Sequence, residues 1–223
     1  MPNTYLSKVG REKYSTDLSG IGGKLRNIPE DFEVREISLI PSYSLTGKYT
    51  IARVKSRNWE TNALIRILAK YLGIYSERIG FAGTKDKRAV TSQLLSFPID
   101  EKKVSTLQIK DVEIEILGKS NRKIKLGELV GNDFTIKVTN AKNAKKNLPP
   151  LISVLKDHFP NYFGVQRFGS IRPITHLVGR EIVNGNFEEA VKIYLYTGST
   201  VEEEDRSFLK DLDSWQTTLD NLP

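Results

Sequence analysis

The sequence predicts an α+β protein with a mixed or antiparallel sheet, on three observations. Short segments in which apolar and polar residues alternate, the period of a half-buried strand, recur between residues 32 and 138. Among them, residues 61–72 carry apolar side chains at helical spacing. After residue 169 the alternation stops and helical spacing takes over. Strands interleaved with single helices also fit an α/β fold, so the pattern alone leaves that alternative open.

The predicted strands lie in the first two thirds of the chain. Residues 1–28, which precede them, are polar and punctuated by glycine, so we expect an arm that leads into the fold. Each predicted strand is rich in β-branched, aromatic or other apolar residues. These strands are residues 32–35, 49–54, 92–97, 112–117 and 134–138, together with a short apolar run at 79–83 that ends in glycine.

One helix is predicted within the strand region. The apolar residues at positions 64, 65, 68 and 72 recur on a single helix face. Thr61 or Asn62 is the expected cap at its start, and Gly73 is expected to close its end.

The chain becomes helical toward its C-terminus. A stretch rich in Lys and Asn leads to Pro149-Pro150, which predicts a turn into a helix over about 150–158. Helical spacing follows at 174–183, 187–196 and 202–212. We therefore expect one domain over residues 1–169 and the start of a second, helical domain over residues 170–223.

Composition excludes several classes of site and protein. With no cysteine in the sequence, disulfides and thiolate metal sites are excluded. His158 and His176 have no partner at metal-ligand spacing. No stretch approaches the roughly 20 apolar residues of a membrane span, and the N-terminus lacks the pattern of a secretory signal. We expect a cytoplasmic protein that holds no metal and contacts no membrane.

Charge is distributed unevenly along the chain. Residues 1–150 hold 27 Lys and Arg against 16 Asp and Glu, a net of +11, whereas residues 151–223 hold 7 against 11, a net of −4. Release of counterions would draw a polyanion such as nucleic acid to the first part. Many proteins with a high isoelectric point bind no nucleic acid, so charge alone leaves both alternatives open.

Residues 80–93 carry the densest functional signal. An apolar run meets Gly83, then Thr-Lys-Asp-Lys-Arg, then the next predicted strand. Turns favour Gly and Asp, so a hairpin whose charges face water is one interpretation. The other is catalytic, because an acid held among cations stays ionised and the cations attract phosphate. Asp86 is the candidate carboxylate.

Residues 160–169 combine three aromatic side chains, two amides and one arginine. Aromatic faces, amide edges and guanidinium groups suit an unstacked nucleic-acid base, which is held by its face and its edge. An aromatic-rich turn that fills a core is the alternative interpretation. The segment is therefore a second candidate for RNA contact.

Four segments together resemble the TruD family of pseudouridine synthases, with order and spacing that agree over residues 12–190. The first is the glycine-rich approach with Pro-Glu-Asp-Phe at 20–37, and the second is Gly-Thr-Lys-Asp-Lys-Arg-Ala-Val-Thr-x-Gln at 83–93. The third is Gly-Asn-x-Phe-x-Ile at 131–136, and the fourth is Asn-Tyr-Phe-Gly-x-Gln-Arg-Phe-Gly at 161–169.

The resemblance implies a fold, an activity and a partner. It implies a pseudouridine synthase catalytic domain, followed after residue 169 by the start of the family's helical insertion domain. It implies isomerisation of a uridine in tRNA, typically at position 13, with no cofactor and no metal. The family's insertion is much longer than the segment after Gly169. We therefore expect the N-terminal portion of a longer enzyme or a reduced member of the family, and we expect a monomer.

The resemblance also implies residue roles. The family's catalytic aspartate falls on Asp86, which either attacks the sugar or removes a sugar proton. A buried, paired carboxylate stays charged at neutral pH, and Arg26 is the candidate partner. Phe134 falls on the residue that stacks on the uracil, and Asn132 lies on the same side of that strand. The remaining assignments are Phe32 to pocket packing, Lys85 to phosphate contact or loop stiffening, and Asn161, Phe163, Gln166 and Arg167 to lining or supporting the site.

Two other functions compete with this one. An RNA-binding or chaperone-like module of the same fold would keep the groove and lack turnover. A DNA-acting or generic basic protein would leave the four ordered motifs unexplained. The expected function is therefore tRNA pseudouridine synthesis, with an inactive RNA-binding module as the alternative.

Overall fold

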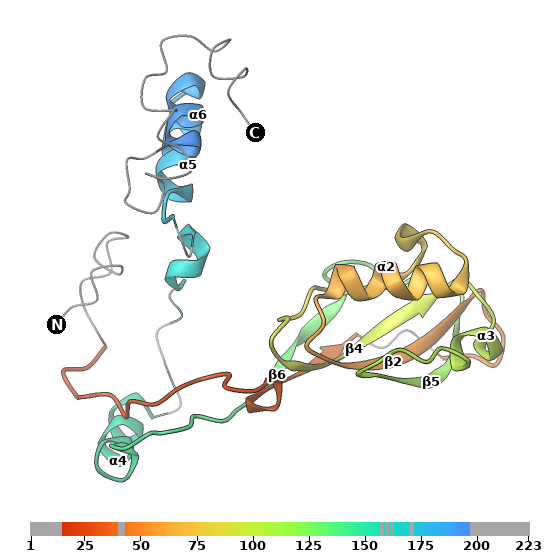
Figure 1. Ribbon diagram of the computed structural model, residues 1–223, viewed down its shortest axis with the longest axis horizontal. Coiled ribbons are helices and arrows are strands. Elements are labelled where there is room, and N and C mark those ends of the chain that lie inside the picture. Colours follow the sequence, from red (N-terminus) through yellow and green to blue (C-terminus); the bar gives the residue numbers. More distant parts are fainter. Residues whose placement is uncertain are drawn as a thin grey trace. The chain divides into compact units, whose positions relative to one another are not determined.

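A computed structural model of the chain describes residues 15–39, 43–156, 158, 161, 163–169 and 172–196. The chain forms two compact units, one of residues 20–149 and one of residues 1–19 with 150–223. The first unit holds a six-stranded mixed sheet with helices (Figure 1), which confirms the predicted α+β class. The predicted domain boundary after residue 169 does not coincide with the division between these units and stays a prediction.

Six strands form the sheet: β1 (Phe32–Ser38), β2 (Tyr49–Arg57), β3 (Gly80–Phe81), β4 (Val90–Phe97), β5 (Val112–Ser120) and β6 (Leu129–Ile136). Their order is β5-β2-β4-β1-β6, with β3 paired to β4 outside this path. β1 and β4 run parallel, and the other pairs are antiparallel. The last strand begins five residues earlier than predicted, at Leu129, because its pairing with β1 extends the strand beyond the region of alternation.

Helix α2 (Thr61–Leu72) covers one face of the sheet (Figure 1). Its predicted apolar face is buried: Leu64 and Leu68 are at most 1% exposed and belong to one core cluster with Leu95 and Phe97 of β4. Removing a Leu or Phe side chain from water contributes about 1.5–3 kcal/mol, so this cluster accounts for the attachment of α2 to the sheet. The helix ends as predicted at Gly73, whose φ of 66° is left-handed.

The cap at the start of α2 differs from the prediction. Glu60, and neither Thr61 nor Asn62, is the N-cap, and its carboxylate accepts hydrogen bonds from the backbone N–H groups of residues 62 and 63. Shorter side chains are the usual caps, but the glutamate carboxylate reaches both free N–H groups. The hydroxyl of Thr61 is thereby left for another contact.

The remaining helical elements are η1 (Pro29–Asp31), η2 (Ser76–Arg78), α3 (Glu101–Ser105), α4 (Ala144–Leu155), η3 (Val165–Phe168), α5 (Thr175–Val183) and α6 (Phe187–Leu195). α4 begins six residues before its predicted start and contains both prolines. Pro149 and Pro150 were interpreted as the start of the helix. Proline lacks the N–H donor but has a helical φ, and here both prolines lie inside the helix. The predicted helix 202–212 lies outside the described residues. None of the described helices combines the length and the apolar character needed to cross a bilayer.

The parallel pairing of β1 with β4 decides where the site is assembled. Glu33 lies beside Val90 in register, so the segments that precede these two strands meet at the same edge of the sheet. β6 runs antiparallel along the other side of β1 and places Phe134 opposite Val34. Three sequence segments that lie far apart along the chain therefore converge within the first unit.

Candidate active site

Asp86 lies in the loop between β3 and β4 and is paired with Arg26. The Nη2 group of Arg26 donates a hydrogen bond to Asp86 Oδ1 at 3.0 Å. The two side chains are 34% and 40% exposed, so Asp86 is half-buried, whereas the sequence suggested a buried carboxylate. An ion pair this accessible to solvent adds only about 0–1 kcal/mol to stability. Its main effect is to orient the carboxylate.

Arg26 is held in an unusual backbone conformation. Its φ of 57° lies in the left-handed region, which non-glycine residues rarely adopt. The following residue is tied to the loop of Asp86, because Arg88 Nη2 donates to the carbonyl oxygen of Asn27 at 2.7 Å. Strained conformations of this kind concentrate at functional sites. The Arg26 guanidinium is thereby aimed at Asp86 by its backbone and by the facing loop.

Two phenylalanines continue the cluster. The guanidinium carbon of Arg26 lies 3.7 Å from the ring centroid of Phe32, a cation–π contact. The rings of Phe32 and Phe134 meet edge to face, with centroids 5.9 Å apart and an interplanar angle of 67°. Phe32 is 8% exposed and Phe134 is 54% exposed. Phe32 is thus a buried support, and Phe134 offers a free ring surface on which a base can stack.

Asn132 lies on the same side of β6 as Phe134. It stands directly opposite Glu36 of β1, and its Oδ1 atom is buried without a hydrogen-bond partner. Paired residues in a ladder project to the same face. The Asn132 oxygen is therefore buried beside Glu36 while the residue as a whole is only partly buried, and a direct role at the base stays a prediction.

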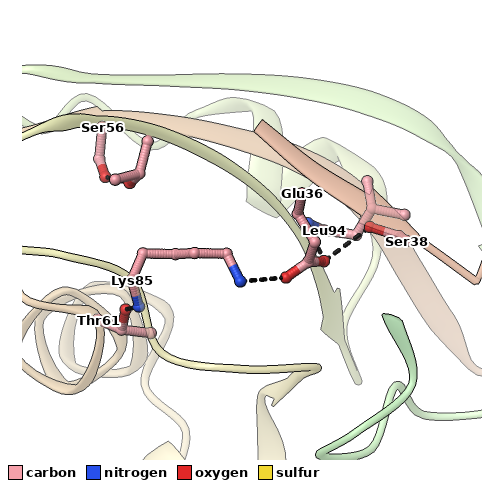
Figure 2. A network of polar contacts seen from close by, with 7 residues as sticks. Glu36, Ser38, Ser56, Thr61, Lys85 and Leu94 are labelled. Carbon is pink, nitrogen blue, oxygen red and sulfur yellow. Dashed lines mark hydrogen bonds and ion pairs between the residues drawn. The ribbon is translucent and has the colours of Figure 1, made fainter. Parts of the chain in front are cut away.

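Lys85 points into the domain. Its side chain is 4% exposed, and its Nζ lies 2.6 Å from Glu36 Oε2 (Figure 2). Of the two roles expected for Lys85, stiffening of the loop agrees with this contact, and phosphate contact does not, because the ammonium is buried. Sequence reasoning assigned no role to Glu36. Its position could have indicated a role, because Glu36 follows Phe32 and Val34 at the two-residue spacing of inward-facing strand positions, where an acidic residue is unusual.

The fourth motif lies in the other unit. Asn161, Phe163, Gln166 and Arg167 are exposed, and the Arg167 guanidinium lies 5.3 Å from the Phe163 ring centroid. η3 contains Gln166 and Arg167. The roles expected for these four residues at the site stay predictions.

The first unit also carries a hollow of about 530 Å³ beside strands β1, β2, β4 and β6. Its lining includes Arg35, Lys55, Ser92, Asp133 and also Phe134, and it includes neither Arg26 nor Asp86. Arg35 and Asp133 pair with each other there at 2.7 Å. The carboxylate of the Thr-Lys-Asp-Lys-Arg segment is Asp86, so we centre the candidate site on the Asp86 cluster, which shares Phe134 with this hollow.

Comparisons with known proteins agree with the motif pattern. The model of the family described as "tRNA pseudouridine synthase D (TruD)" matches residues 8–223. A Methanosarcina mazei protein named "Probable tRNA pseudouridine synthase D" is 41% identical over 97% of this chain and 52% of its own length. A Pyrococcus abyssi protein of the same name is 45% identical over 90% of this chain and 50% of its own length.

A solved structure agrees as well. The crystal structure of the TruD protein from Methanosarcina mazei matches with a TM-score of 0.79 at 40% identity, covering 97% of this chain and 52% of that one. The chain thus spans about half the length of the curated relatives it matches. With a family model that matches nearly the whole chain, and relatives above 30% identity, the chain belongs to the tRNA pseudouridine synthase D (TruD) family.

Proposed function

We propose that this chain carries the catalytic carboxylate of a tRNA pseudouridine synthase, which isomerises a uridine, typically at position 13, to pseudouridine. The observation that carries the proposal is the cluster of Asp86, Arg26, Phe32 and Phe134, which joins an oriented carboxylate to a half-exposed aromatic ring. The reaction is an isomerisation, so it requires no redox partner and no nucleotide fuel. No cofactor is part of the proposal.

The chemistry needs an extruded base and an ionised acid. The bond from C1′ to N1 of the uridine breaks, the uracil turns, and a new bond forms from C1′ to C5, whose proton is released while N1 gains one. Extrusion of the base costs a few kcal/mol, and stacking on Phe134 offsets about 1–3 kcal/mol. Asp86 attacks the sugar or removes a sugar proton, and both routes use the same carboxylate.

The proposal extends to organisation and partners. Residues 1–169 are the N-terminal part of the catalytic domain, and residues 170–223 begin the insertion domain. The net charge of +11 over residues 1–150 supports a path for tRNA over this part of the chain. The protein acts as a monomer in the cytoplasm and binds RNA without a metal.

Release of tritium from tRNA labelled at uridine C5 tests the proposal. We expect the chain to release tritium and Asp86→Asn to abolish release, with tRNA affinity within a few-fold of the parent. Normal turnover by that variant would remove Asp86 from the mechanism. Binding of tRNA without any release by the parent chain would favour the inactive RNA-binding module. Equal competition by duplex DNA would argue for a generic basic protein.

A further inference from the structure

A buried ion pair lies directly beneath the Asp86 loop. The side chains of Lys85 and Glu36 are 4% and 0% exposed, and the distance from Nζ to Oε2 is 2.6 Å (Figure 2). The contact lies off the alignment of a hydrogen bond, so the attraction is electrostatic. The other carboxylate oxygen, Oε1, accepts from Ser38 Oγ at 2.7 Å and from the Leu94 N–H at 3.4 Å. Contacts with β1 and β4 therefore hold the Glu36 carboxylate independently of Lys85.

Lys85 is fixed at its backbone as well. Its N–H donates to Thr61 Oγ1 at 2.8 Å, and Thr61 is 2% exposed in the first turn of α2. One residue is thus attached to the sheet through its side chain and to the covering helix through its main chain. Asp86 is the next residue, and its side chain reaches Arg26. Any shift of Lys85 is passed to Asp86 through a single peptide unit.

The surroundings of Glu36 explain why the Lys85 ammonium points inward. Register places Glu36 between Asn132 of β6 and Gln93 of β4, on the face that α2 covers. Gln93 Oε1 and Asn132 Oδ1 are buried without hydrogen-bond partners. Glu36 is thus the one charged group beside two inward amide side chains, and a cation paired with its buried carboxylate is favoured. A buried charge without a partner would be costly.

We propose that Glu36 and Thr61 are positioning residues for Asp86, acting through Lys85. This inference rests on the function proposed for Asp86. Glu36 and Thr61 touch neither substrate nor reacting atoms in this mechanism. They fix the main chain at residue 85, and this holds the Asp86 carboxylate in contact with Arg26 and in position to reach the sugar.

Glu36→Gln in the full chain is the first test, because it keeps the shape of the side chain and removes its charge. A misplacement of about 1 Å costs on the order of 10²-fold in rate, so we expect a fall of that order in the single-turnover rate constant. The affinity for tRNA is expected to stay within about threefold, because Glu36 is buried away from the RNA. A folded Glu36→Gln variant with the parent rate would overturn the role of Glu36.

The double variant Glu36→Gln with Lys85→Met separates positioning from charge balance. Removing both charges relieves the penalty of an unpaired buried ion, so the melting temperature should return toward that of the parent. The rate constant should stay low, because the anchor of the loop is still missing. Recovery of the parent rate together with the melting temperature would show that only charge balance matters, and would sink the inference.

Thr61 supplies a milder pair of variants for use if Glu36→Gln fails to fold. Thr61→Val loses the acceptor for the Lys85 N–H, and Thr61→Ser keeps it. We expect Thr61→Val to lower the rate constant about tenfold, the loss that follows from one hydrogen bond of about 1.4 kcal/mol. Thr61→Ser should keep the parent rate constant. Equal rates for the two variants would contradict the anchoring role of Thr61.

Glu113→Gln is the matched control. Glu113 pairs with Lys55 at 3.8 Å between exposed side chains of β5 and β2, so the same substitution there should leave rate and melting temperature unchanged. If the parent chain releases no tritium, the proposed function and this inference fail together. If the parent and Glu113→Gln are active and both folded Glu36→Gln and Thr61→Val match them, only the positioning role fails.

Discussion

Arg26 contacts both Asp86 and Phe32 through one guanidinium group. Its Nη2 lies 3.0 Å from the carboxylate of Asp86, and its central carbon lies 3.7 Å from the centroid of Phe32. The planar group can present its edge to the carboxylate and its face to the ring, which an ammonium cannot do equally well. Arg26 therefore links the acid to the aromatic pair in the proposed site.

Substitution of Arg26 should affect the orientation of the Asp86 carboxylate much more than the stability of the fold. We expect Arg26→Ala to lower the single-turnover rate constant about 10–100-fold, because the carboxylate loses its orienting partner. Stability should change by no more than about 1 kcal/mol, since the pair is partly exposed. The rate constant of Arg26→Lys should lie between those of the parent and Arg26→Ala, because lysine keeps the positive charge and lacks the planar pair of guanidinium donors. Single-turnover tritium release and thermal melting measure these effects.

Arg35→Ala is the control for this series. Arg35 forms an ion pair with Asp133 at 2.7 Å between exposed side chains, so its loss removes a paired but more exposed arginine outside the Asp86 cluster. An unchanged rate constant in Arg26→Ala would show that Arg26 has no part in catalysis.

The exposed ring of Phe134 should matter more for turnover than for binding. Loss of a stacked aromatic costs about 1–3 kcal/mol per base, so Phe134→Ala should slow turnover by roughly 5–150-fold with a smaller change in tRNA affinity. Phe134→Tyr keeps the ring and should stay near the parent rate. Val130, 69% exposed on the same strand, provides Val130→Ala as a control. Parent kinetics in Phe134→Ala would exclude the ring from the site.

Binding of tRNA should weaken steeply with salt. The excess positive charge of residues 1–150 releases counterions from phosphate on binding, so the logarithm of the association constant should fall linearly with the logarithm of salt concentration. Lys87 is exposed next to Asp86, and Lys87→Ala should reduce the slope by about 1. Lys103→Ala, on α3, should leave the slope unchanged. Affinity that does not respond to salt would contradict the predicted RNA path.

The cap of α2 makes stability depend on pH. Hydrogen bonds from the backbone N–H groups of Asn62 and Ala63 hold the pKa of Glu60 below its ordinary value. A lowered folded-state pKa means that the stabilisation is fully present above the ordinary glutamate pKa of about 4.3. It is lost as the pH falls through the lower, folded-state value.

Urea unfolding at two pH values checks this dependence. At pH 7, Glu60→Ala should lower the free energy of unfolding by about 0.5–2 kcal/mol, and the difference from the parent should shrink under acid conditions below the folded-state pKa. Glu60→Asp is the control, because aspartate is itself a favoured cap. A penalty for Glu60→Ala that is independent of pH would mean that the carboxylate charge does not stabilise the helix.

Local pattern predicted most elements of the first unit. The alternating segments became β1, β2, β4, β5 and β6, and the helical spacing before Gly73 became α2, because burial on one face imposes a period of two or of 3.6 residues on the sequence. Two boundary details were wrong, one set by a distant partner and one by an uncommon local cap. The start of β6 is set by its pairing with β1, and the cap of α2 is a residue of unusual type for that position.

The components of the site were named from motif positions, and their catalytic roles stay predictions. The structure adds the contacts that join Arg26 to Asp86 and Phe32 to Phe134. Glu36 was missed because it lies one residue beyond the predicted strand 32–35, so its inward position was not recognised. Its partner lies 49 positions away, at residue 85.

The amino-acid sequence by itself determined the family, the types of most elements and the identity of the candidate carboxylate, because motifs and hydrophobic periodicity are written in neighbouring residues. Only the tertiary structure decided that β1 and β4 lie side by side in parallel, that Lys85 turns inward to Glu36, and that Asp86 turns to Arg26. These are contacts between distant segments, and their free energy depends on register, burial and charge that no local pattern encodes.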